Sequence, residues 1–216
     1  MGGRVQRAAA PPRRHRPLRA RDHPVHTAGR GRACGGLSVL GVGLVRGINV
    51  GGNARVAKAD LAAAFEAAGF EEVGTLLQSG NAVFRGSGAP TAAQAEAVVA
   101  ALAESSGVSV GVVLLPEDRF RRIAADNPLL EASDDDSRLV VTFLDHDVPS
   151  GVTAPEDADL APEVVRLGDR AIYQWSPLGV SKSVVPAAFW RSLGPVATGR
   201  NQRTVLRLLA ELDRRG

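Results

Sequence analysis

The order of the predicted strands and helices between residues 37 and 115 constrains the fold of this chain most. Apolar residues alternate or run together in four segments, as in strands, and recur at helical spacing in two others. In chain order these are strand 38–45, helix 58–68, strands 73–78 and 82–85, helix 91–105 and strand 109–115. The order βαββαβ is that of a ferredoxin-like unit, an antiparallel sheet with both helices on one face.

Turn and cap residues support these boundaries. Gly69 and Gly107 follow the two predicted helices, where glycine readily adopts the left-handed backbone of a helix end. Thr91 precedes the second helix and is its predicted N-cap. Ser79 and Gly80 separate two strands and predict a hairpin with a two-residue loop.

The second half, residues 116–216, predicts another α+β layer. Its segments are helix 116–125, strands 138–144, 163–167 and 171–175, helices 186–193 and 201–212, and polar loops at 134–136 and 149–159. This order does not repeat the first half cleanly, so we expect a related but smaller subdomain. The predicted fold class is α+β, with packed subdomains at 37–115 and 116–216.

Charge is distributed unevenly along the chain. Residues 1–36 carry nine arginines and one acid, whereas the other 180 residues carry 17 basic and 22 acidic side chains, net −5. The basic segment lacks apolar periodicity, so we expect it to be disordered. An upstream start codon added to a shorter gene, a tail for an anionic surface and an organelle-targeting segment are three open interpretations. The acidic remainder gives no electrostatic reason to expect a nucleic-acid partner.

Composition removes several function classes from the folded part. The only cysteine is Cys34, and His146 is the only histidine beyond residue 36, so we expect neither a metal site nor a thiolate nucleophile. We also expect no cofactor. The longest uncharged apolar run has nine residues, 37–45, and a membrane helix needs about 20. We therefore expect a cytoplasmic protein without a membrane segment.

Four short segments resemble the signature of a known family. They are Arg46 to Gly52, Gln78 to Asn81, Gly179 to Lys182 and Thr198 to Asn201. In this order and spacing the chain resembles the DUF1697 family of uncharacterised bacterial proteins over about residues 37–212. The resemblance implies two packed α+β subdomains of ferredoxin-like character and no known activity.

The chain departs from that family at three positions and at its start. The family usually has an aromatic residue at Gln202 and apolar residues at Lys58 and Ser183. It also begins almost at the first strand, which favours a misplaced start in this chain. The glutamine removes the stacking role that an aromatic residue would have at position 202.

The glycine-rich loop and the few lysines suggest an anion site. Glycines of the 46–52 loop turn the backbone tightly, and their exposed amides with an arginine can surround an anion. The chain has 24 arginines and two lysines, Lys58 and Lys182, and an ammonium group donates to phosphate or carboxylate. We expect an anionic small molecule to bind between the subdomains, at Arg46, Asn49, Gly51, Gly52, Asn81, Lys182, Thr198, Arg200 and Asn201.

The sequence leaves the kind of function open. No pair of nucleophile and base is visible, so catalysis would rest on positioning and charge stabilisation. The first alternative is a protein-interaction or assembly module without catalysis, including a homo-oligomer. RNA or DNA binding has less support, because only Phe84 is aromatic on the strands of the first unit.

Overall fold

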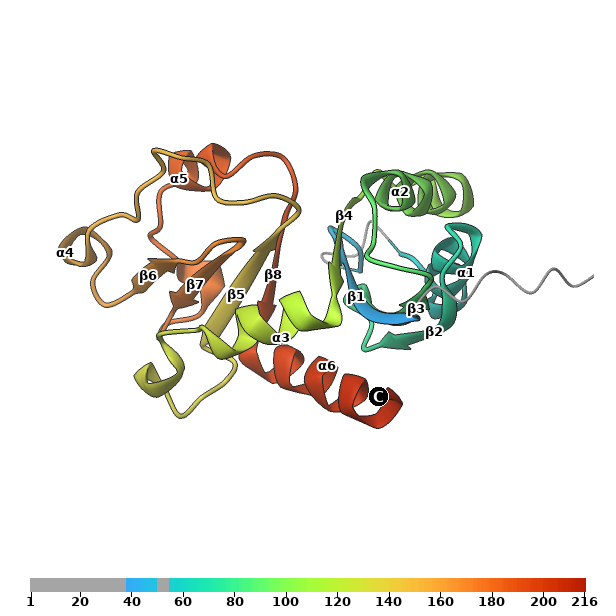
Figure 1. The fold of residues 1–216 in the computed structure, drawn as a ribbon. Coiled ribbons are helices and arrows are strands. Elements are labelled where there is room, and N and C mark those ends of the chain that lie inside the picture. Colours follow the sequence, from blue (N-terminus) through green and yellow to red (C-terminus); the bar gives the residue numbers. More distant parts are fainter. Residues whose placement is uncertain (1–37, 50–54) are drawn as a thin grey trace, which may run out of the picture. The chain divides into compact units, whose positions relative to one another are not determined.

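The structure is a computed structural model that describes residues 38–49 and 55–216. These residues belong to one compact unit, which contains two four-stranded sheets (Figure 1). The basic segment predicted to be disordered lies outside the described residues, as do residues 50–54 of the glycine-rich loop.

The first half of the chain forms one sheet and two helices. Its elements are β1 (Val39–Arg46), α1 (Lys58–Ala67), β2 (Glu71–Leu76), β3 (Asn81–Gly86), α2 (Ala92–Ser106) and β4 (Gly111–Pro116). The strands are antiparallel in the order β2-β3-β1-β4. The predicted βαββαβ connectivity is confirmed.

The turn between β2 and β3 is longer than predicted. Leu76 pairs with Asn81, so the turn has four residues, and the predicted two-residue loop is wrong. Leu77 has a φ of 59° and Gly80 a φ of 75°. A left-handed backbone at Leu77 ends the strand there, although its apolar side chain fits a strand pattern.

The predicted ends of α2 are confirmed. The side chain of Thr91 accepts a hydrogen bond from the backbone of Gln94, whose side chain accepts one from the backbone of Thr91. This reciprocal pair satisfies donors that the first helical turn leaves free. Gly107 ends the helix with a φ of 68°.

The second half repeats the topology of the first. Its elements are β5 (Leu139–Leu144), α4 (Asp157–Leu160), β6 (Val164–Leu167), β7 (Ala171–Trp175), α5 (Ala187–Ser192) and β8 (Ala197–Asn201). The strands are antiparallel in the order β6-β7-β5-β8. Connectivity and strand order therefore match those of the first sheet, and the expectation that the second half does not repeat the first is wrong.

The sequence predicts neither α4 nor β8. With four residues, α4 is too short for helical periodicity and lies in a segment predicted as a polar loop. The sequence of β8 is Ala-Thr-Gly-Arg-Asn, which lacks the apolar residues of a typical strand. Its polar residues predict a helix cap instead, and the structure confirms this role for Asn201 alone, which accepts from the backbone of Thr204.

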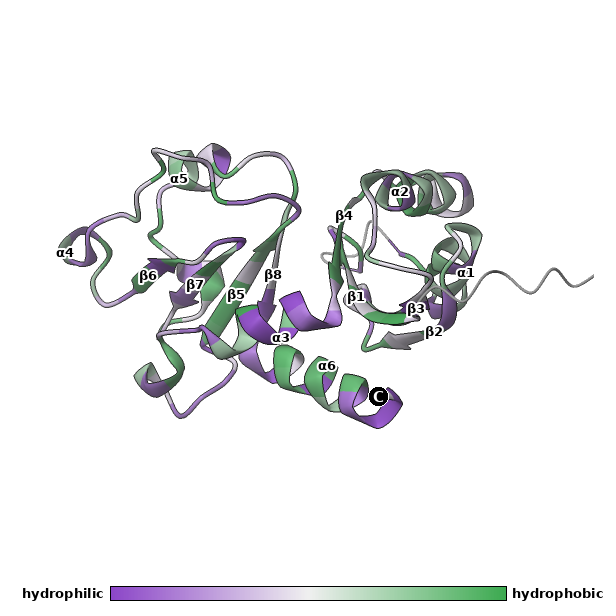
Figure 2. Ribbon diagram, viewed as in Figure 1, coloured by the Kyte–Doolittle hydropathy of each residue, from purple (hydrophilic) through white to green (hydrophobic). Residues whose placement is uncertain are grey.

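The remaining elements are two helices, which pack between the sheets, and two short turns of 3-10 helix. The helices are α3 (Glu117–Ala125) and the last helix α6 (Gln202–Arg215), and the turns are η1 (Leu130–Ala132) and η2 (Val180–Lys182). Phe120 of α3 and Leu208 of α6 share one buried apolar cluster with Val113 of β4 and Phe143 of β5. Apolar and charged residues occupy different sides of α6 (Figure 2). One face of each sheet thus contributes to a common core.

The other face of each sheet has its own helices. Phe65 of α1 and Leu102 of α2 pack against the first sheet, around Phe84. Leu160 of α4 and Phe189 of α5 pack against the second. Both sheets are therefore buried on two faces.

Candidate functional site

Strand β8 presents its residues alternately to two sides, as strands do. Thr198 and Arg200 are buried, whereas Gly199 is exposed and Asn201 is half-buried. The first pair faces the first half of the chain, and the second pair lies on the outer face of the second sheet. One short motif therefore contributes to two different environments.

The guanidinium group of Arg200 is held by oxygen atoms of the protein. Its Nε donates to Oδ1 of Asn81 at 2.5 Å, and its Nη2 donates to the carbonyl oxygens of Val45 at 2.8 Å and Ser79 at 3.0 Å. Its Nη1 donates to Oγ1 of Thr198 at 2.7 Å. Burial lowers the pKa of Arg200 to about 10, because loss of water disfavours the charged form. Arg200 thus joins β8 to β1 and to the β2–β3 turn.

The two predicted asparagines support the same junction. Asn81 is fully buried and donates to Oγ of Ser79 at 3.0 Å while it accepts from the buried guanidinium. Asn49 donates to the carbonyl oxygen of Gln78 at 2.6 Å, and its Oδ1 accepts from the backbone of Val56 at 3.1 Å. Asn49 therefore fixes the glycine-rich loop to the hairpin turn.

The other predicted site residues lie apart from this hydrogen-bonded group. Arg46 is exposed and donates to the carbonyl oxygen of Pro195 at 3.1 Å. Lys182 is exposed at the end of η2. Gly51 and Gly52 lie outside the described residues. Neither of the two exposed cations contacts the buried guanidinium.

A pocket of about 440 Å³ lies on the outer face of the second sheet. Three neighbouring strands form its floor, and η2 and α5 form its walls. Its lining residues are Ser137, Val140, Thr142, Gln174, Val180, Ser183, Trp190, Gly199 and Asn201. Val140 pairs with both Gln174 and Asn201, and Thr142 pairs with Gly199, so the polar floor residues come from adjacent positions of the sheet.

The pocket exists because the helices on this face are short. In the first half α1 has ten residues and α2 has 15, whereas in the second half α4 has four and α5 has six. Each residue adds about 1.5 Å to a helix, so the second pair reaches over less of its sheet. Polar side chains on this part of the sheet therefore border a pocket and not a covering helix.

Gly199 deepens the floor of the pocket. A Cβ atom at this position would lie 3.4 Å from Cγ1 of Val140 and 3.5 Å from Oγ1 of Thr142, which is ordinary contact distance. The backbone of Gly199 is not left-handed, so the fold does not require glycine there. The missing side chain instead leaves space above the sheet.

A buried carboxylate fixes the orientation of one floor residue. The Nε2 of Gln174 donates to Oγ of Ser183 at 3.0 Å, and that hydroxyl donates to Oε2 of Glu163 at 2.8 Å. Nε2 also lies 3.4 Å from the same carboxylate oxygen. A carboxylate only accepts hydrogen bonds, so the amide nitrogen of Gln174 must face Glu163. Its Oε1 is then the atom available to a ligand.

Sequence reasoning missed Glu163, Gln174 and Thr142 as site residues. The available signal is a polar residue inside an otherwise apolar strand, as Thr142 is in β5 and Gln174 in β7. Both are buried, and buried polar side chains need partners. That signal alone does not distinguish a ligand from a partner in the protein.

Comparisons with known proteins identify the family. The family model described as a protein of unknown function, DUF1697, matches residues 41–173. The chain belongs to the DUF1697 family. The solved structure of the conserved bacterial protein SP0830 from Streptococcus pneumoniae is 25% identical, with a TM-score of 0.57, over 80% of this chain and 98% of that one. No curated protein matches the chain.

The signature segments of this DUF1697 protein fall into two groups. Asn49 and residues 78–81, with Thr198 and Arg200, form the junction between the halves of the chain. Gly199 and Asn201 border the pocket on the second sheet, as does Val180 within the 179–182 segment. The family signature therefore combines a structural junction with one side of a pocket.

The described part of the chain shows neither a cluster of metal ligands nor a membrane-spanning helix. No three side chains of histidine, cysteine, aspartate or glutamate are grouped there as metal ligands. His146 has a single acidic contact, 2.5 Å from its Nδ1 to Oδ1 of Asp145. No helix in the described ranges combines the length and apolar character needed to cross a bilayer.

Proposed function

We propose that the protein binds a small polar ligand with an anionic group in the pocket on the second sheet. The observation that carries the proposal is the convergence of Thr142, Gln174 and Asn201, from three adjacent strands, around a glycine that leaves space above them. Ligand sites typically combine such a concave surface with a few oriented polar groups.

The polar groups have defined hydrogen-bonding roles. Gln174 offers an acceptor, Oε1, because Glu163 and Ser183 occupy its nitrogen. Asn201 offers a donor, Nδ2, because its Oδ1 caps α6 by accepting from Thr204. Thr142 between them can donate or accept. A ligand with several hydroxyl or amide groups, such as a sugar or a nucleoside, matches this set.

Lys182 supports the anionic part of the proposal. It lies on the turn that also contributes Val180 and Ser183 to the pocket wall. Its side chain is exposed, and we expect its ammonium group, on a flexible stem, to reach a phosphate or carboxylate at the rim. Arg46 and Arg200, the other predicted cations, donate to oxygens of the protein instead.

RNA binding has less support than binding of a small ligand. The first sheet carries α3 and α6 on the face opposite α1 and α2, so it offers no open surface for stacking bases of RNA. Catalysis by positioning and charge stabilisation would extend the proposal to an enzyme.

Calorimetric titration with paired ligands tests the proposal. Glucose 6-phosphate with glucose, and AMP with adenosine, separate the contribution of the phosphate. We expect the phosphorylated member of one pair to bind. Lys182→Ala should weaken that binding by about tenfold or more, since a charge-assisted hydrogen bond contributes about 1.5–3 kcal/mol. Lys58→Ala, which changes the only other lysine, is the matched control.

Gly199→Leu provides an independent test of the location. The leucine fills the floor, and the exposed position accepts a side chain without a left-handed backbone. We expect loss of binding with an unchanged melting temperature. Failure of both ligand pairs to bind, or undiminished binding by Gly199→Leu, contradicts the proposal.

A further inference from the structure

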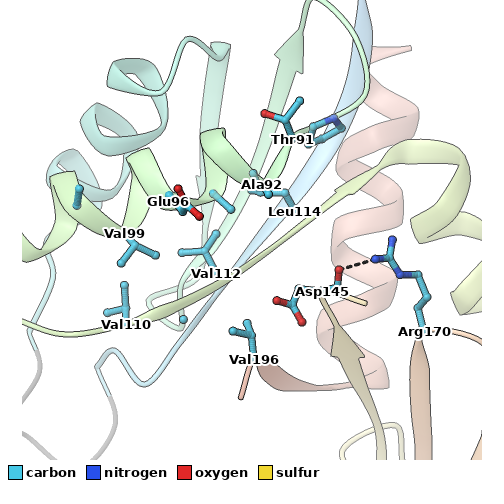
Figure 3. A pocket seen from close by; sticks show the side chains of 14 residues that line it. Thr91, Ala92, Glu96, Val99, Val110, Val112, Leu114, Asp145, Arg170 and Val196 are labelled. Carbon is cyan, nitrogen blue, oxygen red and sulfur yellow. Dashed lines mark hydrogen bonds between the residues drawn. The ribbon is translucent and has the colours of Figure 1, made fainter. Parts of the chain in front are cut away.

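A second cavity lies beside the edge of the first sheet. It has a volume of about 650 Å³ and is bordered by α2 and β4 on one side (Figure 3). Asp145, Arg170 and Val196 of the second half form the opposite wall. The two walls make a groove along β4, the last strand in the order β2-β3-β1-β4.

The backbone of β4 has groups that point into this groove. The N–H of Val45 donates to the carbonyl of Gly80, on the β3 side of β1, so the neighbouring residue Leu44 directs its backbone groups toward β4. Leu44 pairs with Val113. The backbone N–H and C=O of Val113 therefore bond to β1. Those of Val112, at the adjacent position, point away from β1 and into the groove.

The same alternation applies to Leu114, which also lines the groove. Pro116 fits this pattern, because it occupies an outward position and has no N–H to donate. Among the described residues, no backbone group bonds to the outward groups of Val112 and Leu114. The edge strand is apolar and carries no charged residue, unlike edges that exclude other strands.

The walls of the groove provide room for small apolar side chains. Ala92 and Ala95 of α2 line it with single methyl groups, and Val99, one turn further along the helix, adds an apolar surface. Figure 3 shows Ala92 and Val99 on the helix side, with Val110, Val112 and Leu114 along the strand. An extended chain beside β4 would direct alternate side chains onto this surface.

The charges in the groove favour a basic partner. The carboxylates of Glu96 and Asp145 line it, from α2 and from the end of β5. The cation Arg170 is already engaged, since it donates to the backbone oxygen of Asp145 and pairs with Asp147 at 3.2 Å. A lysine or arginine of a bound segment would meet the carboxylate of Glu96 and the second oxygen of Asp145, whose Oδ1 contacts His146.

We propose that this groove binds an extended peptide segment of a partner protein, with small apolar side chains and one basic residue. The peptide adds a strand to β4 through the outward groups of Val112 and Leu114, and Asp145 selects the basic residue. Strand addition of this kind obtains affinity from backbone hydrogen bonds and specificity from alternate side chains. Val196 and Arg170 stand opposite β4, and a Cβ atom at Gly111 would lie 3.4 Å from Cγ1 of Val196, so we expect the walls to exclude the edge of another sheet.

Fluorescence anisotropy with synthetic peptides tests the proposal. The probe is a labelled peptide of alternating valine and threonine with a central lysine, and its counterpart has a central glutamate. We expect the lysine peptide to bind at least about tenfold more tightly, because like charges at an interface are strongly unfavourable. Asp145→Lys should reverse this preference. Hydrogen exchange at the amides of Val112 and Leu114 should slow when the peptide is bound.

Substitutions at two alanine positions distinguish blocking of the groove from a general loss of structure. Ala92→Phe fills the groove, whereas Ala93→Phe places the same side chain on a neighbouring exposed residue outside it. We expect only the first variant to lose the peptide. Equal affinity for the two peptides, undiminished binding by Ala92→Phe, or a dimer that Ala92→Phe dissociates in light scattering would overturn the proposal. The last result would assign the groove to a second copy of the chain.

Discussion

The Nε of Arg200 donates a 2.5 Å hydrogen bond to Oδ1 of Asn81, which lies 119 positions earlier in the chain. Arg200→Met removes this donor and those to the carbonyls of Val45 and Ser79. We expect the free energy of unfolding to fall by about 3 kcal/mol or more, since each buried polar group left without a partner costs about 1–3 kcal/mol. Urea denaturation measures the change.

Two further variants serve as comparisons for Arg200→Met. Arg200→Lys keeps the positive charge but not the planar set of five donors, so we expect an intermediate loss of stability. Arg214→Met removes an exposed arginine that pairs with Glu211, and exposed pairs contribute about 0–1 kcal/mol. A similar stability for the Arg200→Met and Arg214→Met proteins would show that the buried junction does not hold the fold.

Gly80 occupies a turn beneath this junction, where a methyl group should be costly. Its φ is 75°, and a Cβ atom there would lie 2.9 Å from the carbonyl oxygen of Val45. Gly107 has a φ of 68° with nothing within 4 Å, so Gly107→Ala tests backbone strain alone. We expect about 1 kcal/mol for Gly107→Ala and a larger loss for Gly80→Ala, measured by thermal unfolding. Equal losses would mean that the turn moves away from Val45.

Tyr173 should make stability depend on pH under alkaline conditions. Burial raises its pKa to about 12 from 10.0, with further contributions from Asp126 and Asp169, and its hydroxyl donates to the carbonyl oxygen of Ile123 at 2.9 Å. Between these two values the native state keeps the proton and the unfolded chain loses it. The stabilisation is therefore present below pH 10 and is lost as the pH rises through about 12.

The pKa of Tyr173 can be measured directly, because the chain has one tyrosine. Tyrosinate absorbance of the native protein should show a midpoint near pH 12, and that of the protein in denaturant a midpoint near pH 10. Tyr173→Phe should remove this part of the pH dependence of unfolding. A native midpoint near 10 would contradict the burial of the phenol.

Gln202 offers a stabilising substitution. Its Oε1 is buried without a partner among the described residues, at a position where the resemblance leads us to expect an aromatic residue. Gln202→Met keeps the length of the side chain and removes the unpaired oxygen. We expect stability to rise by about 1 kcal/mol, or about 2–4 °C in melting temperature for a chain of this size. Calorimetry measures both.

Gln94, another glutamine, provides a control for the Gln202→Met substitution. Gln94 is exchanged for methionine in the same way, but its side chain completes the cap of α2 with Thr91. Loss of a cap costs about 0.5–2 kcal/mol, so Gln94→Met should lower the melting temperature. Opposite signs for the two substitutions would support the assignment of Gln202 as an unsatisfied buried group.

The fold could be predicted where local signals were strong. Thr91, Gln94 and Gly107 mark the ends of α2 by their own chemistry, and the apolar run of β1 is unmistakable. By contrast, β8 is a strand because it pairs with β5 and because Arg200 is bonded to residues more than 100 positions away. Such long-range contacts override the local preference of polar residues, and no window of sequence contains them.

The candidate site, too, could be predicted from local motifs but not from long-range contacts. The signature segments identified residues that matter to the structure, but a glycine and an asparagine can hold a turn as well as a ligand. Asn81 and Arg200 are occupied with each other, whereas Asn201 borders a pocket that depends on the length of α4 and α5. How far a helix extends over a sheet depends on tertiary packing. Thr142 and Gln174 therefore could not be recognised from sequence alone as the floor of the pocket.

The unequal helices of the two halves have an evolutionary consequence. The second sheet keeps the strand order of the first although α4 and α5 are short, because its inner face is buried in the core that it shares with α3 and α6. The part of the outer face that these helices leave uncovered thus contributes less to stability than the apolar cluster beneath them. Substitutions there can accumulate while the backbone persists, so relatives with the same architecture can diverge in what they recognise.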